Sequence, residues 1–344
     1  MIVFAGNLII TCSIKQKSML KTLNKYLSKI GLDGFLIGIM LMVVLAYFFP
    51  SLGIAKKPFS LEELANYGVS GIFFFYGLKL NLQKLKAGLA NWKMHILIQS
   101  TTFILFPLLV LLIKPLFISE EANQLWMGIF YLASLPSTVS SAVVMVSLAN
   151  GNVTSAIFNA SISSLIGVIV TPIWVGMFMA TSTGSFDLQS IVIKLTLQVL
   201  LPVAIGMLLN AKLGYLAERY KTVLKLFDQS IILTIIYTSF CKSFTENLFQ
   251  GFSIIDILLL ASGMLFLFFT LLFITQKISK LLGFSREDTI TVMFCGSKKS
   301  LVHGTVMSKI LFANASITGI LLLPIMLYHA LQLIAVSVIA KRMN

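Results

Sequence analysis

Two adjacent lysines, Lys298 and Lys299, interrupt an apolar part of the sequence, within the stretch FCGSKKSLVHG at residues 294–304. The surrounding residues predict a membrane-spanning segment, in which a charge at the bilayer centre costs about 3 kcal/mol. An ammonium group carries three hydrogen-bond donors and can hold carbonyls, hydroxyls or an anion. The polar side chains nearest to the pair are Ser297, Ser300 and His303. The stretch therefore predicts a polar site inside a membrane protein.

A second polar interruption, SLPSTVSS at residues 134–141, lies in an apolar segment of the first half of the chain. Pro136 has no N–H to donate and clashes with the preceding turn, and Gly296 gives the later stretch the freedom to leave a helix. The hydroxyls that can bond freed backbone groups near Pro136 belong to Ser137, Thr138, Ser140 and Ser141. Proline kinks are common in membrane helices, but two interruptions at matching places indicate a transporter's binding site.

The composition is that of a polytopic membrane protein, because 58% of the 344 residues are hydrophobic and only 11% are charged. Soluble domains carry about 25% charged residues. The net charge of +14 is explained by Lys and Arg in cytoplasmic loops, so no nucleic-acid partner is expected. The cysteines lack metal or disulfide spacing, and no ATP-binding motif occurs, which argues against an ATP-driven pump and against any cofactor besides a coupling ion.

Hydrophobic windows of about 20 residues predict ten membrane-spanning helices. Their predicted ranges are 32–50, 62–80, 92–113, 122–149, 152–180, 189–211, 228–248, 254–276, 287–312 and 315–340. Lys and Arg gather at the segment ends that lie on the same side as both termini, so the termini are predicted to be cytoplasmic and the membrane to be the inner (cell) membrane. Residues 1–31 are predicted to form a basic cytoplasmic segment, with 1–13 as an upstream extension.

Ten spans divide into two halves of five, and an odd number of spans turns the second half upside down relative to the first. The predicted halves are residues 32–181 and 189–340, joined by the weakly polar loop TSTGSFDLQ. In each half the interrupted span is followed by a short link, ANGN or FANAS, and then by an apolar span with a proline, Pro172 or Pro324. The sequence therefore predicts an all-α membrane protein with an inverted repeat.

Several stretches resemble the bile acid:sodium symporter family. They are LPSTVSSAVVMVSLANGN, AIFNASISSLIGVIVTPIW, FCGSKKSLVHG and FYGLKLNLQKLKAGLANWKMHILIQSTTFILFPLL. Within the family the chain is similar to the branch typified by solute carrier family 10, member seven, and its bacterial relatives. The resemblance implies two inverted five-helix repeats arranged as a panel and a core domain. It also implies that helices 4 and 9 are broken and cross at the membrane midplane, where sodium-coupled members bind two Na⁺.

The family's sodium ligands match this sequence only in part. The matching positions are Ser140 and Ser141 on helix 4, Ser155 and Asn159 on helix 5, and Thr102 on helix 3, with Gln99 one turn earlier. On helix 9 the family's glutamate falls on Phe294 and its glutamine falls on Lys298. The carboxylate at the centre of the family's sodium site is therefore absent from this chain.

Two hypotheses follow for Lys298. It is a built-in cation that takes the place of an ion, which leaves at most one Na⁺ for Ser140, Ser141 and Asn159 to hold, or it loads and releases a proton during the transport cycle. The alternative is that helix 9 is shifted, so that both Lys298 and Lys299 reach a water-filled cytoplasmic vestibule.

We expect a secondary active transporter of a small organic anion, coupled to Na⁺ or H⁺. Lysines beside the positive ends of broken helices favour an anion, and the acidic residues fall at or near the ends of the predicted spans. The protein is expected to be a lipid-embedded monomer and not an enzyme. Two alternatives stay open: a non-transporting regulator or receptor on the same scaffold, and an intramembrane hydrolase that uses Ser300 with His303.

Overall fold

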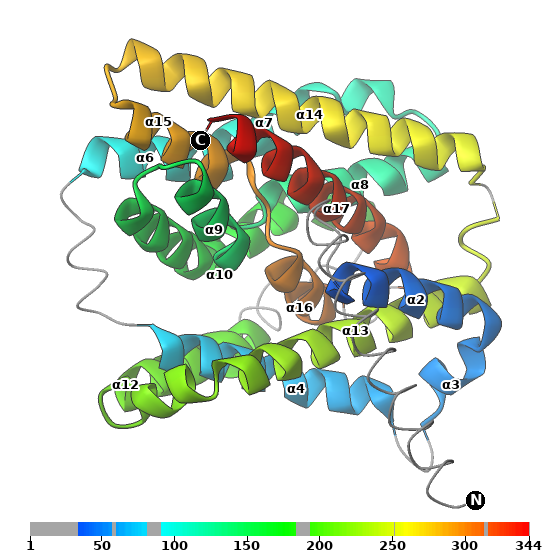
Figure 1. The fold of residues 1–344 in the computed structure, drawn as a ribbon. Helices are drawn as coiled ribbons and strands as arrows, with labels where there is room; N and C mark the ends of the chain where they lie inside the picture. Colours follow the sequence, from blue (N-terminus) through cyan, green and yellow to red (C-terminus); the bar gives the residue numbers. More distant parts are fainter. Residues whose placement is uncertain are drawn as a thin grey trace, which may run out of the picture.

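The computed structural model describes residues 34–56, 60–80, 91–183, 193–250, 252–312 and 316–343, and within these ranges the regular structure is entirely helical (Figure 1). The predicted basic segment 1–31, including the upstream extension 1–13, lies outside the described residues, as does most of the predicted loop between the two halves.

The described helices of the first half follow the predicted ranges closely. They are α2 (Gly34–Phe48), α3 (Pro50–Ile54), α4 (Leu61–Lys79), α6 (Trp92–Ser100), the π-helix η1 (Thr101–Leu105), α7 (Phe106–Leu112), the 3₁₀ turn η2 (Lys114–Leu116), α8 (Glu120–Ser134), α9 (Ser140–Leu148) and α10 (Val153–Thr183). The helix α10 ends at Thr183, three residues into the stretch predicted as the loop between the halves.

In the second half, several helices extend beyond their predicted ranges. They are η3 (Thr196–Leu200, a π-helix), α12 (Leu201–Arg219), α13 (Lys221–Thr245), α14 (Ile254–Leu281), α15 (Arg286–Ser297), α16 (Leu301–Leu311) and α17 (Thr318–Met343). The predicted connection at 212–227 is almost wholly helical, and only Tyr220 separates α12 from α13. Its Lys, Arg and Glu residues read as a polar loop, yet these residues, like the Leu and Ala residues between them, are strong helix formers.

Serine residues mark the starts of many of these helices. The side-chain oxygens of Ser60, Ser119, Ser253, Ser285 and Ser300 each accept a hydrogen bond from the backbone N–H three residues later. Such an N-cap satisfies one of the backbone donors that the first turn of a helix leaves free. At Ser253 the Asp256 carboxylate also accepts from the Ser253 backbone, which completes a capping box.

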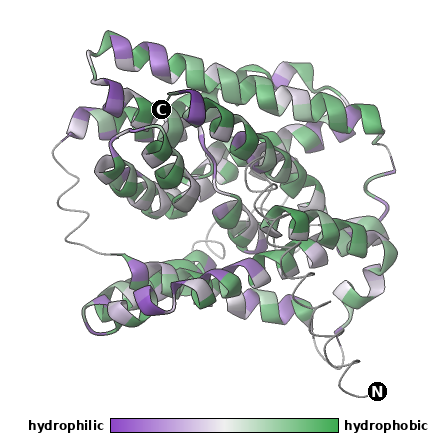
Figure 2. Cartoon of the chain, viewed as in Figure 1, coloured by the Kyte–Doolittle hydropathy of each residue, from purple (hydrophilic) through white to green (hydrophobic). Residues whose placement is uncertain are grey.

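Among the described residues, six helical segments are long and apolar enough to cross a membrane by length and composition. They are Trp92–Leu116, Val153–Phe178, Ile193–Arg219, Lys221–Thr245, Ile254–Leu281 and Thr318–Met343. On α14 the apolar side chains of Leu258, Phe266 and Phe273 are more than half exposed, and the hydrophilic residues gather toward the end that leads to α15 (Figure 2). A helix face with several large, exposed apolar side chains is stable in lipid and rare on soluble monomers. The ten-span topology stays a prediction.

The helices form two groups, and each group takes helices from both halves of the chain. The first group consists of α2, α3, α4, η3, α12 and α13, and lies along the bottom of Figure 1. The second group, above it in that view, consists of α6, η1, α7, α8, α9, α10, α14, α15, α16 and α17. The groups meet where α13 packs against α16 and α17.

Close packing of α4 on α12 holds the first group together. A Cβ atom added to Gly206 would collide with the main-chain oxygen of Phe74, and one added to Gly77 would collide with that of Val203. Small residues at helix interfaces let backbones approach each other, and in lipid this packing replaces the hydrophobic driving force between helices.

We predict that Gly206→Ala lowers the thermal unfolding midpoint of the purified protein in detergent. The new methyl group forces α4 and α12 apart, at a cost of about 1–3 kcal/mol. Gly263→Ala on α14 is the matched control, because a Cβ atom there meets nothing within 4 Å, and it is expected to be neutral or slightly stabilising. Equal midpoints for the two variants would contradict this packing.

Candidate functional site at the two helix breaks

The two interrupted segments of the sequence are broken helices in the structure. Residues 135–139 separate α8 from α9, and residues 298–300 separate α15 from α16. The two breaks touch, because the backbone N–H of Ser300 donates to the carbonyl of Pro136 at 3.0 Å. The predicted breaking residue Gly296 is still helical, and α15 ends after Ser297. Gly296 is closely packed, since a Cβ atom added there would lie 3.3 Å from a Thr101 methyl carbon.

Side chains of α10 satisfy the backbone groups that the first break sets free. The Thr171 hydroxyl donates to the carbonyl of Ser134 at 2.7 Å, and the Ser163 hydroxyl accepts from the N–H of Ser137 at 2.9 Å. The Ser137 hydroxyl itself is buried and has no partner among the described residues. A backbone group left unpaired in an apolar interior costs several kcal/mol, so α10 stabilises the break by supplying these partners.

Side chains of α17 do the same for the second break. The Tyr328 hydroxyl donates to the carbonyl of Ser297 at 2.6 Å. One turn along α17, the Gln332 amide accepts from the N–H of Lys299 at 3.0 Å and donates to its carbonyl at 2.9 Å. Gln332 therefore pairs with the backbone N–H and C=O of Lys299, as a neighbouring β-strand would. The Ser297 hydroxyl is used locally, as a donor to the carbonyl of Met293.

The Lys299 ammonium is held by three backbone carbonyls. It donates to Thr102 at 2.7 Å, to Ala133 at 2.6 Å and to Leu135 at 2.7 Å, and its side chain is fully buried. Ala133 and Leu135 lie at the C-terminal end of α8, where the helix dipole favours a cation. The ammonium also lies 4.4 Å from the centre of the Phe106 ring. All three donors are thus used within the protein.

The free carbonyl of Thr102 has a local cause in the sequence. In the π-helix η1 the N–H of Phe106 bonds to Thr101, five residues earlier, and the next N–H is missing because residue 107 is a proline. The carbonyls of Thr102 and Phe103 therefore need donors from elsewhere. Lys299 serves the first, and the indole N–H of Trp174 donates to Phe103 at 2.8 Å.

The Lys298 ammonium is equally buried and far less well bonded. It donates to the Ser141 hydroxyl at 3.1 Å, and that hydroxyl donates in turn to Thr138 at 3.3 Å. No other hydrogen bond of this ammonium and no carboxylate partner is found among the described residues. The side chain of Ser140, the other predicted helix 4 ligand, lies outside the description. Lys298 is therefore the lysine of the pair with donors to spare.

The predicted ligand Asn159 belongs to a polar network of its own. Its amide nitrogen bonds to His95 at 2.8 Å and to the Ser155 carbonyl at 2.8 Å, and its amide oxygen accepts from Gln99 at 3.2 Å. The oxygen of Gln99 is buried without a partner among the described residues. Asn159 and Gln99 are thus brought together, whereas Thr102 contributes through its main chain and not through its hydroxyl, which bonds to Ile98.

A cavity of about 340 Å³ lies beside the breaks, between α4 and α16. Its lining includes Phe73, Tyr76, Thr138, Ser161, Ser300 and His303, and the ion pair of Lys79 and Asp228, 3.3 Å apart, lies at the C-terminal end of α4. Neither Lys298 nor Lys299 is among the lining residues. The cavity combines aromatic rings with hydroxyl and imidazole groups, which suits an amphipathic small molecule.

Ser300 and His303 are paired, but their contact has a structural cause. The Ser300 hydroxyl shares a hydrogen bond of 3.0 Å with His303 Nδ1 and also accepts the His303 backbone N–H at 3.2 Å. The second bond is the N-cap of α16. The imidazole is buried, with its ring centre 5.9 Å from those of both Phe73 and Tyr76.

Sequence reasoning missed Gln332, Tyr328 and Trp174, because each reads as an isolated polar or aromatic residue in an apolar span. The available signal was their spacing. Tyr328 and Gln332 are four residues apart, so they share one face of α17, and that face meets the second break. Which helix that face would meet could not be read from the sequence.

We predict that Lys299→Met destabilises the protein strongly and that Lys298→Met does not. The first change leaves three buried carbonyls without donors, and each unsatisfied group costs about 1–3 kcal/mol. The second removes a buried charge with one described hydrogen bond, a change that is often neutral or stabilising. Thermal unfolding in detergent measures both. A midpoint for Lys298→Met that falls as far as that for Lys299→Met would contradict this division of roles.

Comparison with known proteins identifies the family. The family model described as the SBF-like CPA transporter family matches residues 33–344. A Pseudomonas aeruginosa protein without a characterised function is 38% identical over 310 residues, which cover 90% of this chain and 92% of that protein. YfeH of Escherichia coli K12, provisionally named a symporter, is 34% identical over 314 residues, with coverages of 90% and 92%.

Among animal proteins, rat sodium/bile acid cotransporter 7 is 32% identical over 322 residues, which cover 92% of this chain and 93% of that protein. The functional names among these relatives are those of transporters and not of enzymes. The resemblance to bile acid:sodium symporters is thereby confirmed, and with its long apolar helices the chain is an integral membrane protein. The protein belongs to the SBF-like CPA transporter family.

Proposed function

We propose that this protein is a secondary active transporter that moves a small organic anion by alternating access around the two helix breaks. The observation that carries the proposal is the contact between the breaks, next to a cavity that lies between the two groups of helices. In transporters with inverted repeats, broken helices form the site near the bilayer midplane, and one group of helices rocks against the other. We assign the panel to the first group and the core to the second.

The topology belongs to the same proposal. Residues 32–181 and 189–340 are two inverted repeats, α8–α9 and α15–α16 are the broken fourth and ninth of ten spans, and both termini lie in the cytoplasm at the inner membrane. Support comes from the way both sequence halves contribute to both groups of helices. The protein acts as a lipid-embedded monomer in this proposal.

The coupling ion is Na⁺ or H⁺, and Lys298 stands where an ion binds in sodium-coupled relatives. Its ammonium contacts Ser141, one of the predicted ion ligands. A fixed cation there repels a second cation by several kcal/mol in a low dielectric, so at most one Na⁺ binds nearby. The names of the animal relatives include sodium and bile acid, which makes sodium the first ion and a bile acid the first anion to test.

The anionic substrate is favoured by the charges around the cavity. Asp228, the acidic residue in its lining, is paired with Lys79. The positive end of α16 faces the cavity through Ser300 and His303. An organic cation would find no free carboxylate in this lining, whereas an anion would find hydroxyl donors.

Counterflow into proteoliposomes tests transport itself. Organic anions, a bile acid among them, are first screened by their effect on the thermal midpoint with and without Na⁺ and across pH, since a ligand of the native state stabilises it. The anions that stabilise the protein are expected to show counterflow. Binding without counterflow would favour the non-transporting regulator.

We predict that Lys298→Gln changes the ion dependence of transport. Replacing the fixed charge by an amide opens a place for a cation, so the thermal midpoint and the uptake should rise with Na⁺ more steeply than in the parent protein. Lys277→Gln on an exposed part of α14 is the control for loss of one positive charge. Uptake by Lys298→Gln that equals the parent at every sodium concentration and pH would refute the role of Lys298.

A further inference from the structure

A second cavity, of about 400 Å³, lies at the opposite ends of α4 and α16 from the first. The first cavity is lined by the C-terminal part of α4 and the start of α16, whereas the second is lined by Glu62 at the start of α4 and by Lys309 and Phe312 at the end of α16. Residues of α3, α13 and α17 complete it. Like the first cavity, it therefore lies between the two groups of helices.

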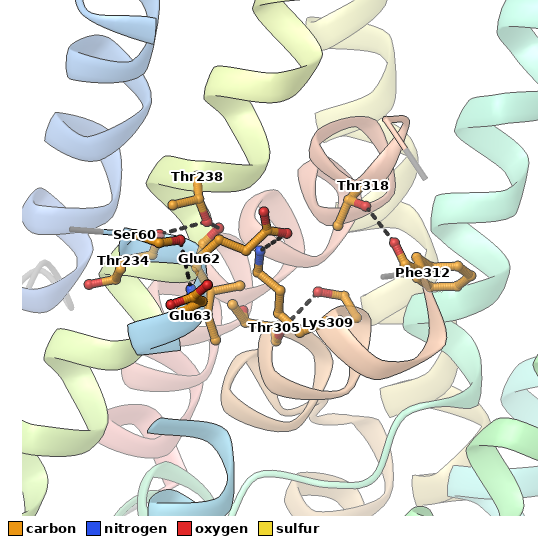
Figure 3. Close-up of polar contacts among 11 residues, drawn as sticks. Ser60, Glu62, Glu63, Thr234, Thr238, Thr305, Lys309, Phe312 and Thr318 are labelled. Atoms are coloured by element: carbon orange, nitrogen blue, oxygen red, sulfur yellow. Dashed lines mark hydrogen bonds and ion pairs between the residues drawn. The ribbon is translucent and has the colours of Figure 1, made fainter. Parts of the chain in front are cut away.

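The Lys309 ammonium in this cavity is only loosely paired among the described residues. Its side chain is only 9% exposed, and its one described ionic partner is the Glu62 carboxylate at 3.7 Å, which is beyond hydrogen-bond distance (Figure 3). The Glu62 side chain is 52% exposed. A largely buried ammonium with three donors is thus left with a loose contact to a carboxylate that can turn into solvent.

Two buried hydroxyls near Lys309 also have no partner among the described residues. One is the side-chain oxygen of Ser239, which lines the cavity. The other belongs to Thr305, which lies one turn before Lys309 on α16 but is not among the lining residues (Figure 3). An unpaired buried hydroxyl costs about 1–3 kcal/mol. Lys309 and Ser239 thus place hydrogen-bond donors without a close acceptor in the same cavity.

The charges that line the cavity favour an anion. Lys56, Lys242 and Lys309 face Glu62 and Glu246, so the described lining carries one more positive than negative charge. The remaining surface includes Gly53, Ile54 and Phe312, which offer space and apolar contact. Three ammonium groups against two carboxylates make this lining unfavourable for a divalent cation.

We propose that the second cavity is a binding site for the carboxylate of an amphipathic organic acid, which takes the place of Glu62 at Lys309. The Glu62 carboxylate already marks where such a group binds. The ligand carboxylate accepts from the Lys309 ammonium and the Ser239 hydroxyl, and its carbon skeleton lies against Ile54 and Phe312. This inference goes beyond transport, because binding at this site requires no passage of the ligand through the protein.

The site has a consequence for the two groups of helices. Glu62 belongs to the first group and Lys309 to the second, so their ion pair bridges the groups at this end of the molecule. A ligand that replaces Glu62 removes this bridge and leaves the groups freer to separate around the second cavity.

Isothermal titration of the purified full chain in detergent tests the site, with benzoate as the probe and uncharged benzamide as its match. We expect benzoate to bind and benzamide not to bind. Lys309→Gln should weaken benzoate binding roughly tenfold or more, and Glu62→Gln should strengthen it several-fold because the competing carboxylate is gone. Lys277→Gln, which removes the same charge far from the cavity, should leave binding unchanged.

Ser239→Ala separates a ligand site from a simple packing defect. If the hydroxyl serves a ligand, the variant is at least as stable as the parent and binds benzoate more weakly. A variant that is more stable with unchanged benzoate affinity would refute the role of Ser239. The proposal is overturned if benzoate does not bind the parent protein at millimolar concentrations. It is also overturned if the parent, Lys309→Gln and Glu62→Gln bind benzoate with equal affinity. If Lys309→Gln does not fold, the comparison of Glu62→Gln with the parent decides the matter.

Discussion

Backbone groups that cannot reach water must find partners inside the protein, and the centre of this molecule is organised around that requirement. Two helices break in the same region, and each break releases donors and acceptors that the regular helix would have paired. The partners come from two other helices: α10 provides Ser163 and Thr171, and α17 provides Tyr328 and Gln332. The helix made of α6, η1 and α7 supplies no such partners and instead adds to the demand, because its π-helix and Pro107 leave two more carbonyls without a donor from the helix itself.

The Lys299 ammonium satisfies three of these backbone carbonyls at once. It joins the carbonyls of α8 to the carbonyl that η1 leaves free, and so ties three elements together at one point. A cation held by carbonyl oxygens needs no carboxylate, in the same way that a selectivity filter replaces the hydration shell of an ion. Lys298 lies next to it in sequence but points to Ser141 and keeps donors free. Lys299 is thus a structural cation, whereas the adjacent Lys298 keeps hydrogen-bond donors available for chemistry.

The sequence predicted both breaks within a few residues, because proline and clusters of small hydroxyl residues are local signals. It also predicted the apolar helices, and the membrane setting follows from composition alone. It misplaced the end of α12 and the start of α13, since the Lys, Arg and Glu residues there read as a loop although they are good helix formers. Gly296 was assigned to the break on its backbone freedom, whereas the structure uses it for close packing against Thr101.

Sequence by itself therefore determined the class of protein, the places where two helices are interrupted and the presence of two lysines at one of them. Only the tertiary structure decided what each lysine does, because adjacent residues look alike in sequence and differ in which helices their side chains meet. The same holds for Asn159 and Gln99, predicted as ion ligands, which bond to each other, while Asn159 also bonds to His95. Hydrogen-bond partners from distant helices are set by how the helices pack, and no local pattern encodes that arrangement.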